Sequence, residues 1–240
     1  MEMDKSEIHK SEMDEHLNFR NYMRDLILGV NDGLVSVFAL VLGVAGAGFL
    51  PINVLLAGIA AAVAGAISMA IGEYISTKSQ EQVYDAEKEL ERQHIRDHLD
   101  HEIEELYEFY SAKGFEGKLL DQIVEKIASD EDVLLKEMML FEFGVLEEER
   151  RSPIKATVII GIAFLVGALP PIVPFFFVNE TSTGILWSTI LSLFGLFMVG
   201  WIKGVLVKSN RVLDGLENFG LGAAGAAITY LIGLMVGGSV

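Results

Sequence analysis

Carboxylate and imidazole side chains recur at three- and four-residue spacing along one stretch of this chain. Residues with that spacing lie on one face of an α-helix. Three of the five histidines fall in this stretch. Converging carboxylates and imidazoles can bind a divalent metal ion, and a solvated charged face is the alternative interpretation. The residues concerned are Glu91, His94, His98, His101, Glu102 and Glu105.

A second group of candidate ligands lies about forty residues further along. Met138 and Met139 are followed by Glu142, and Met138 and Glu142 are one helical turn apart. A thioether is a soft metal ligand, so this group could add a methionine sulfur and a carboxylate to the metal site. The alternative interpretation is that both methionines pack a hydrophobic core.

Two acids fall within strongly apolar stretches, where an ionisable group costs about 2.5–3.5 kcal/mol to insert into lipid. They are Asp32 and Glu73, and Met69 lies one turn before Glu73. Such acids usually face a pore, a partner or a cation. We therefore expect Asp32, Met69 and Glu73 to mark a cation path, against the alternatives of a helix cap and an interfacial acid.

The distribution of charged and apolar residues along the chain predicts the elements that position these side chains. The mean hydropathy is +0.41 although the net charge is −16. Residues 80–151 hold 22 of the 34 acids, residues 1–24 hold another 6, and the remaining stretches are almost uncharged. A membrane-spanning helix needs about 20 apolar residues, and five stretches qualify. They are residues 26–50, 52–75, 156–178, 185–207 and 219–236.

All 18 lysines and arginines lie on one side of these five stretches. By the positive-inside rule, this side is the cytoplasm. The sequence therefore predicts a cytoplasmic N-terminus, a cytoplasmic insert between the second and third spans, and a C-terminus outside. The short segments that flank the spans favour a prokaryotic cell membrane, with a vacuolar membrane expected in a eukaryote.

The charged insert reads as three helices, expected over residues 81–113, 116–127 and about 129–149. The predicted fold is an all-α membrane protein of about five spans with this cytoplasmic helical insert. The predicted domains are residues 1–24 (N-terminal segment), 25–79 (spans one and two), 80–151 (acidic metal-binding domain) and 152–240 (spans three to five).

Several classes of function are disfavoured. The chain has no cysteine, which excludes disulfides, thiolate metal ligands and thiol redox chemistry. Its acidity argues against nucleic acid as a partner, because nucleic-acid-binding proteins carry basic patches.

Small residues at four-residue spacing, such as Gly58/Ala62, Gly222/Ala226 and Gly233/Gly237, allow close helix packing, either within one subunit or across a dimer interface.

Two long motifs resemble a known family. Residues 24–36 (RDLILGVNDGLVS) and 65–76 (GAISMAIGEYIS) are similar to the first- and second-span signatures of the vacuolar iron transporter family. The resemblance covers nearly the whole chain. It implies a homodimeric transporter, with no enzymatic activity and no permanently bound cofactor, that exports Fe(II) and often Mn(II) from the cytoplasm in exchange for protons.

The resemblance also implies roles for particular residues. Asp32 and Met69 match the membrane path. In the insert, a first pair of ligands falls on Glu91 and His94, and a second on Glu102 and Glu105. Met138, Met139 and Glu142 match the last group. In two places the chain departs from the family pattern, because His94 replaces a glutamate and Ala61 stands where some members carry a membrane-embedded glutamate.

The leading hypothesis is therefore a proton-coupled exporter of divalent iron or manganese. One alternative is a membrane-tethered ferritin-like ferroxidase, for which only one of the two expected Glu-x-x-His motifs is present, at Glu91 and His94. Another is a metal-sensing or structural membrane protein that does not transport.

Overall fold

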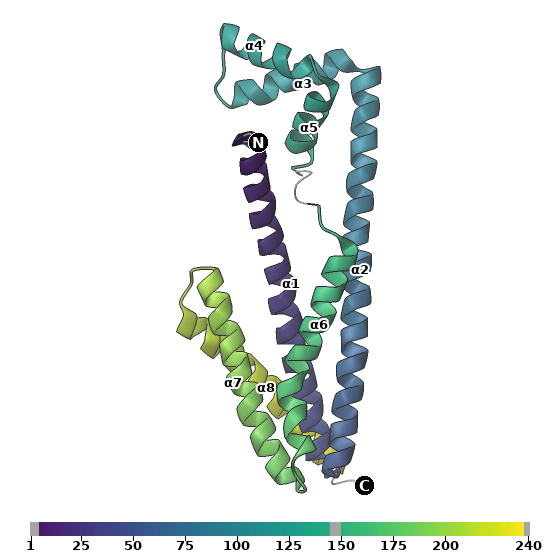
Figure 1. Cartoon of the computed structure of the whole chain (residues 1–240), viewed down its shortest axis with the longest axis vertical. Coiled ribbons are helices and arrows are strands. Elements are labelled where there is room, and N and C mark those ends of the chain that lie inside the picture. The colour runs from purple at the N-terminus through teal and green to yellow at the C-terminus, as the bar shows by residue number, and fades with distance from the viewer. Residues whose placement is uncertain (1–4, 145–149, 238–240) are drawn as a thin grey trace. The chain divides into compact units, whose positions relative to one another are not determined.

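The computed structural model describes residues 5–144 and 150–237, with side chains from residue 22 onward. Within these residues the chain is helical and has no strand (Figure 1). The helices are α1 (Lys5–Gly46), α2 (Pro51–Asp97), α3 (Leu99–Ala112), α4 (Gly117–Ala128), α5 (Glu131–Glu142), α6 (Pro153–Ile172), the 3-10 helix η2 (Val173–Phe176), α7 (Thr181–Leu206) and α8 (Arg211–Gly237).

Five helical segments of the described chain are long and apolar enough to cross a membrane, which confirms the predicted number of spans. They are Tyr22–Gly46, Pro51–Asp97, Pro153–Phe176, Thr181–Leu206 and Arg211–Gly237. The connection between the first two is short. Gly48 adopts φ +85° there, and Pro51 begins the next helix, where its missing N–H is not needed.

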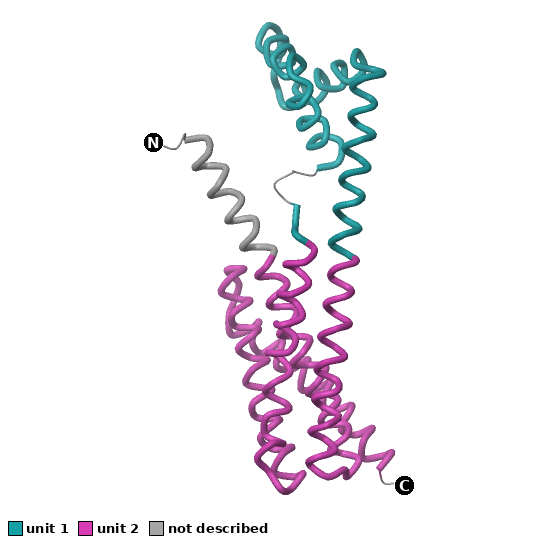
Figure 2. The backbone as a smooth tube through the Cα atoms, turned by 45° about the vertical axis from the view of Figure 1, so that its right-hand side comes forward, with its two compact units in different colours: residues 1–18, 76–152 teal, residues 19–75, 153–240 magenta. Residues whose placement is uncertain are grey.

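The chain divides into two compact units (Figure 2). The first, called here the insert unit, takes in Ser76–Ser152, and the second, the spanning unit, takes in Phe19–Ile75 and Pro153–Val240. Helix α2 contributes its apolar first half to the spanning unit and its charged second half to the insert unit.

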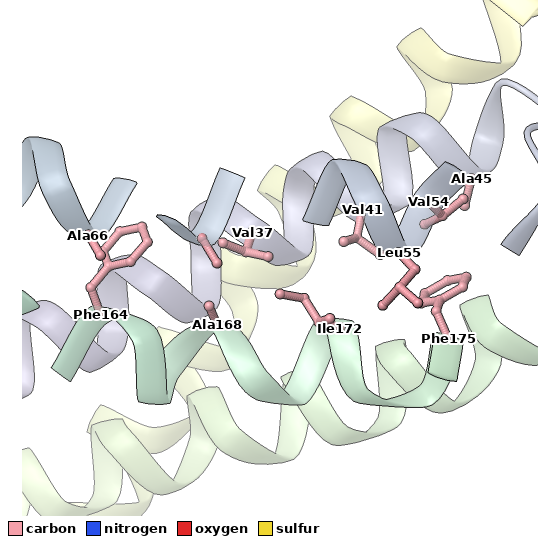
Figure 3. Packing of buried hydrophobic residues seen from close by; sticks show 11 residues of the cluster. Val37, Val41, Ala45, Val54, Leu55, Ala66, Phe164, Ala168, Ile172 and Phe175 are labelled. Carbon is pink, nitrogen blue, oxygen red and sulfur yellow. The ribbon is translucent and has the colours of Figure 1, made fainter. Parts of the chain in front are cut away.

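Glycines set the helix crossings of the spanning unit. A Cβ on Gly33 of α1 would overlap the backbone of Phe164 in α6, and a Cβ on Gly167 of α6 would overlap the backbone of Val30. The two helices therefore approach each other at backbone distance on both sides of this crossing. Apolar side chains from α1, α2, α6 and η2 form a core between these helices (Figure 3).

The predicted small-residue pairs pack within the chain. A Cβ on Gly58 would touch Ile172, one on Gly222 would overlap Leu196, and one on Gly233 would overlap the carbonyl of Gly43. Their partners Ala62 and Ala226 are buried as well. Of the two interpretations offered by the sequence, packing within one subunit accounts for these three pairs.

Prolines end the third span. Pro170 and Pro171 lie in the last turn of α6, and Pro174 follows in η2. Proline has no N–H, so carbonyls one turn earlier lose their helical donor. The hydroxyl of Ser188 in α7 donates to the Pro171 carbonyl at 2.9 Å, which satisfies one acceptor where the α-helix changes to a 3-10 helix.

Helix α8 begins earlier than the apolar stretch of the fifth span, which starts near residue 219. The side chain of Asn210 accepts hydrogen bonds from the N–H groups of Val212 (3.2 Å) and Leu213 (3.3 Å), so the helix starts at Arg211. The first two turns are polar, and they pack closely on α7 because Gly200 and Gly204 leave room for the α8 backbone.

The insert unit differs from the prediction at one point. The sequence favours one unbroken helix over residues 81–113, but the helix breaks at His98 into α2 and α3. Ile95 and Leu106 belong to the same buried cluster. The break therefore lets this cluster take apolar side chains from two helices, α2 and α3, in place of one.

The last insert helix, α5, ends at Glu142, whereas the sequence predicted helix to about residue 149; residues 145–149 lie outside the described residues. Asp130 caps the start of α5 by accepting from the N–H groups of Asp132 (3.1 Å) and Val133 (3.3 Å). Large apolar side chains from α2, α3, α4 and α5 fill the core, among them Leu134, Leu135 and Val124.

Candidate metal site

Three glutamates from three helices of the insert unit meet at one point. Glu91 lies on α2, Glu102 on α3, and Glu142 at the end of α5. One carboxylate oxygen from each lies within 4.8 Å of the other two. Three oxygens this close fit the coordination sphere of a divalent cation, and three bare carboxylates at such a distance repel one another.

Helical spacing explains how the three carboxylates come together. Glu91 lies one turn before Ile95, and Glu102 lies one turn before Leu106; both apolar residues are buried in the core of the insert unit. The same spacing sets Glu142 one turn after the fully buried Met138. Each helix therefore carries its glutamate next to the residue that anchors it in the core.

Two of these glutamates are buried, and three of their four carboxylate oxygens have no hydrogen-bond partner in the described part of the chain. Glu91 is 0% exposed and Glu102 is 3% exposed. Neither carboxylate oxygen of Glu91 has a hydrogen-bond partner among the described residues, and the same holds for Oε2 of Glu102. An unpaired charge in such a place is costly, so the carboxyl groups must either hold protons or share a cation.

The electrostatics of the cluster favour a proton when no cation is present. Burial raises the pKa of Glu91 to about 8, and the nearby charges of Glu142, Glu102 and Glu105 add to this effect. The pKa of Glu142 is also raised by burial and by Glu105 and Glu102, while His94 acts in the opposite direction. Protons and a metal ion would therefore compete for the same oxygens.

A cavity of about 540 Å³ opens beside the carboxylates. Its lining consists of three histidines, three glutamates and one aromatic ring: His94, His98, His101, Glu102, Glu105, Glu142 and Phe109. Nδ1 of His94 lies 3.9 Å from Oε2 of Glu91, and Nε2 of His101 lies 3.4 Å from Oε1 of Glu105. His94 and Glu105 thus border the carboxylate cluster, and their role as ligands stays a prediction.

Met138 and Met139 are placed in the core of the insert unit. They are 0% and 3% exposed and belong to the same buried cluster as Leu106 and Leu135. Packing of the insert core therefore accounts for both methionines. A ligand role for either sulfur stays a prediction.

The three residues predicted for the membrane path all lie in the spanning unit and are half-buried: Asp32 on α1, and Met69 and Glu73 on α2. Met69 packs against the core of Figure 3. The hydroxyl of Ser36 donates to the Asp32 backbone carbonyl at 2.6 Å. Gly29 and Gly33 flank Asp32 and pack on α6, so these two glycines of the motif serve packing.

One polar contact in the spanning unit was not predicted. Asn218 of α8 donates to the side chain of Asn31 at 2.8 Å and to the carbonyl of Leu196 at 2.7 Å. It therefore ties α1, α7 and α8 together beside Asp32. In the sequence, this contact could have been suspected from the amide of Asn218, which directly precedes the apolar stretch expected for the fifth span.

The chain is similar to known proteins over most of its length. A model of the VIT family matches residues 23–234. Vacuolar iron transporter 1 of Tulipa gesneriana is 34% identical over 217 residues, which cover 90% of this chain and 88% of that protein. Vacuolar iron transporter 1 of Arabidopsis thaliana is 30% identical over 236 residues, covering 98% and 94%. Protein CCC1 of Saccharomyces cerevisiae is 31% identical over 214 residues, covering 85% and 66%.

Proposed function

Because the chain belongs to the VIT family, we propose that it is a transporter that exports divalent iron or manganese from the cytoplasm in exchange for protons. The single observation that carries the metal assignment is the group of three glutamate carboxylates from three helices. Two of them are buried. A structural role alone gives no reason to bury such a group without donors.

The insert unit would capture the cation. Carboxylate oxygens suit Mn²⁺ and Fe²⁺, and Glu91, Glu102 and Glu142 would form the centre of the site. Glu105 and His94 would add ligands from the rim, and Met138 or Met139 a sulfur. Because the pKa of Glu91 is about 8, binding at neutral pH would release a proton from this residue.

The spanning unit would carry the cation through the membrane. Asp32 would supply the charge on the path, Met69 a soft ligand, and Glu73 a second carboxylate on α2. Ala61 carries no ionisable group, so Glu73 would stand in for the acid that some family members have at that position. The metal ion and the proton would alternate on these acids.

The side of the membrane and the assembly also belong to the proposal. All 18 lysines and arginines lie on one side of the spans, which supports a cytoplasmic N-terminus and insert with the C-terminus outside. A homodimer is proposed on the family resemblance. The small residues Ala60, Ala64 and Gly72 of α2 are exposed and leave a face on which a second copy could pack closely.

The proposal is tested in liposomes that contain the full-length protein and a pH dye. Mn²⁺ or Fe²⁺ added on one side should enter and drive proton flux in the opposite direction. Asp32→Ala should abolish both fluxes while the protein stays folded. Glu180→Gln is the matched control, because Glu180 is an exposed acid that makes no capping hydrogen bond at the start of α7. Full flux in Asp32→Ala would contradict the proposal.

The ferroxidase alternative has its own readout in the same preparation. A ferroxidase would consume oxygen when Fe²⁺ is added, whereas an exporter would only move the ion. Helix α5 carries no histidine, so a second Glu-x-x-His motif is missing there. We therefore expect no stoichiometric oxygen consumption on addition of Fe²⁺.

A further inference from the structure

A cavity of about 1040 Å³ lies in the spanning unit, between residues 23–31 of α1 and the hairpin that α7 and α8 form (Figure 1). Its volume is at the upper end of the range for small-molecule sites. Gly200 and Gly204 let the α8 backbone pack directly on α7, so the open space lies between the hairpin and α1 and not within the hairpin. The residues proposed for the metal path do not line this cavity.

Charged side chains of both signs, from three helices, line this cavity. The positive ones are Arg24 of α1 and Lys203 in the last turn of α7, and the negative ones are Asp214 and Glu217 near the start of α8. The side chains of Arg24 and Lys203 are 66% and 50% exposed, so a ligand can reach both. Nζ of Lys203 lies 3.9 Å from Oδ1 of Asp214, which is too long for a hydrogen bond. Two positive and two negative groups suit a ligand that itself carries both charges.

The lining of the cavity changes from charged to apolar within one helical turn. On each of the three helices, a charged residue near the end of the span is followed, one turn further into the span, by an apolar residue of the same lining. These pairs are Arg24 with Leu28, Lys203 with Val199, and Glu217 with Leu221. The cavity therefore has a charged mouth at the level where the apolar stretches begin and an apolar interior below it. A phospholipid has the same division between its headgroup and its acyl chains.

We propose that this cavity binds one phospholipid with a primary-amine headgroup, of the phosphatidylethanolamine type. Arg24 and Lys203 hold the phosphate, since basic groups between spanning helices bind lipid headgroups. Glu217 and Asp214 accept hydrogen bonds from the ammonium group, which has three N–H donors.

The charges of the mouth select among lipids. An anionic lipid without an amine offers nothing to the two carboxylates, and the quaternary ammonium of phosphatidylcholine has no N–H to donate. One acyl chain would lie along Leu28 and Leu221. The hydrogen bond from Asn218 to Asn31, at 2.8 Å, joins α8 to α1 in the wall of the cavity. The bound lipid would therefore fill the space beside this contact. The inference is independent of the ion that the protein transports.

Native mass spectrometry of the full-length protein in detergent tests the site, because it counts bound lipids during a titration. The probes are phosphatidylethanolamine, phosphatidylglycerol and phosphatidylcholine with the same acyl chains. The wild-type protein should bind one phosphatidylethanolamine per chain about tenfold more tightly than phosphatidylcholine, since charged hydrogen bonds to the ammonium group distinguish the two. Equal affinity for these two lipids would overturn the proposal, and this comparison needs no variant.

Two variants separate the two ends of the headgroup. Glu217→Gln should lower the affinity for phosphatidylethanolamine about tenfold without lowering that for phosphatidylglycerol, because only the first lipid has an amine. Arg24→Gln should lower both affinities, because both lipids have the phosphate. Glu180→Gln and Lys208→Gln are the matched controls, since both residues are exposed and lie outside the lining of the cavity. Unchanged phosphatidylethanolamine affinity in Glu217→Gln or in Arg24→Gln would overturn the proposal.

A third variant tests the apolar interior and keeps all four charges. Leu221 is 68% exposed, and Leu221→Trp adds bulk where the acyl chain would lie. Both phosphatidylethanolamine and phosphatidylglycerol should then bind severalfold more weakly. A second copy of this chain is the alternative occupant of the cavity. In that case Leu221→Trp would change the ratio of monomer to dimer in the same spectra and leave the bound lipid unchanged, which would overturn the proposal.

Discussion

The spanning unit and the insert unit are both helical and both have an apolar core, but they make their closest helix contacts with different side chains. In the spanning unit the closest contacts are made by glycines such as Gly33 and Gly167, while large residues such as Phe194 and Leu221 face outward at 62% and 68% exposure. In the insert unit the large residues are buried, and Glu91 is buried with them.

The difference follows from the solvent. Lipid is as apolar as a leucine side chain, so a spanning helix gains little by burying one and packs by close backbone approach instead. Water drives leucine and methionine into the core of the insert unit, at roughly 25 cal/mol per Å². Nothing in that driving force explains a buried carboxylate. The glutamates are therefore the part of the insert unit that calls for a function.

The largest expected effect is on the glycine crossing of the spanning unit. Gly33→Ala or Gly167→Ala places a methyl group against the backbone of the facing helix and should lower the free energy of unfolding by roughly 3 kcal/mol. Unfolding in mixed detergent micelles measures it. Gly220→Ala is the control, because a Cβ at Gly220 meets nothing within 4 Å. If Gly33→Ala and Gly167→Ala were as stable as the control Gly220→Ala, the crossing would not be tight.

In the insert unit, replacement of a buried carboxyl should raise the free energy of unfolding instead of lowering it. Glu91→Met replaces a buried carboxyl without a donor by a side chain of similar length that suits its apolar neighbours. At about pH 9 the free energy of unfolding of the metal-free protein should rise by about 1–3 kcal/mol, because the desolvation penalty disappears. Mn²⁺ binding should weaken in the same variant. Exposed Glu104→Gln should change stability by less than about 0.5 kcal/mol. A destabilised Glu91→Met would mean that Glu91 holds the fold together.

The pH dependence of Mn²⁺ binding should be a property of the insert unit, where Glu91 is buried. The pKa of Glu91 is raised from 4.5 to about 8, so the proton must leave before a cation binds at neutral pH. Mn²⁺ affinity should rise about tenfold per pH unit up to about pH 8 and then level off. The stability of the metal-free fold has the opposite pH dependence. The contribution of Glu91 to the free energy of unfolding is complete below pH 4.5 and is lost as the pH rises through about 8.

Calorimetry in buffers of different ionisation enthalpy counts the protons released when Mn²⁺ binds. We expect about one proton per Mn²⁺ at about pH 7, and fewer in Glu91→Met. If the wild-type protein released no proton, Glu91 would already be ionised and its pKa would not be raised.

The smallest effect should be the same in both units. Asp130 caps α5 in the insert unit and Asn210 caps α8 in the spanning unit, each accepting from two backbone N–H groups. Asp130→Ala and Asn210→Ala should each lower the free energy of unfolding by about 1 kcal/mol, since a cap acts on its own helix. A much larger loss at either position would show that the cap also holds tertiary contacts.

The sequence predicted the five spans because hydropathy acts over about 20 residues and leaves a strong signal. It missed the break at His98, since neither glycine nor proline marks it. It also missed the early start of α8, which looked polar, although Asn210 is a recognisable N-cap.

The candidate site was only partly accessible from the sequence. Spacing predicted that Glu91 and Glu102 share a face of one helix, but they lie on two helices, α2 and α3; the family resemblance singled out Glu142. Nothing in the sequence indicates that two of these glutamates are buried with unpaired carboxylate oxygens, because burial depends on how α2, α3 and α5 pack. That burial is what separates them from the exposed acids of the same helices.

Mn²⁺ titration of the full-length protein tests the central claim most directly, with wild type compared with Glu91→Gln/Glu102→Gln. Three converging carboxylates predict a tight Mn²⁺ site in the wild-type chain that the double variant loses, while the chain still folds. Equal Mn²⁺ affinity in the two proteins would contradict the account, because the buried glutamates would then not hold the metal.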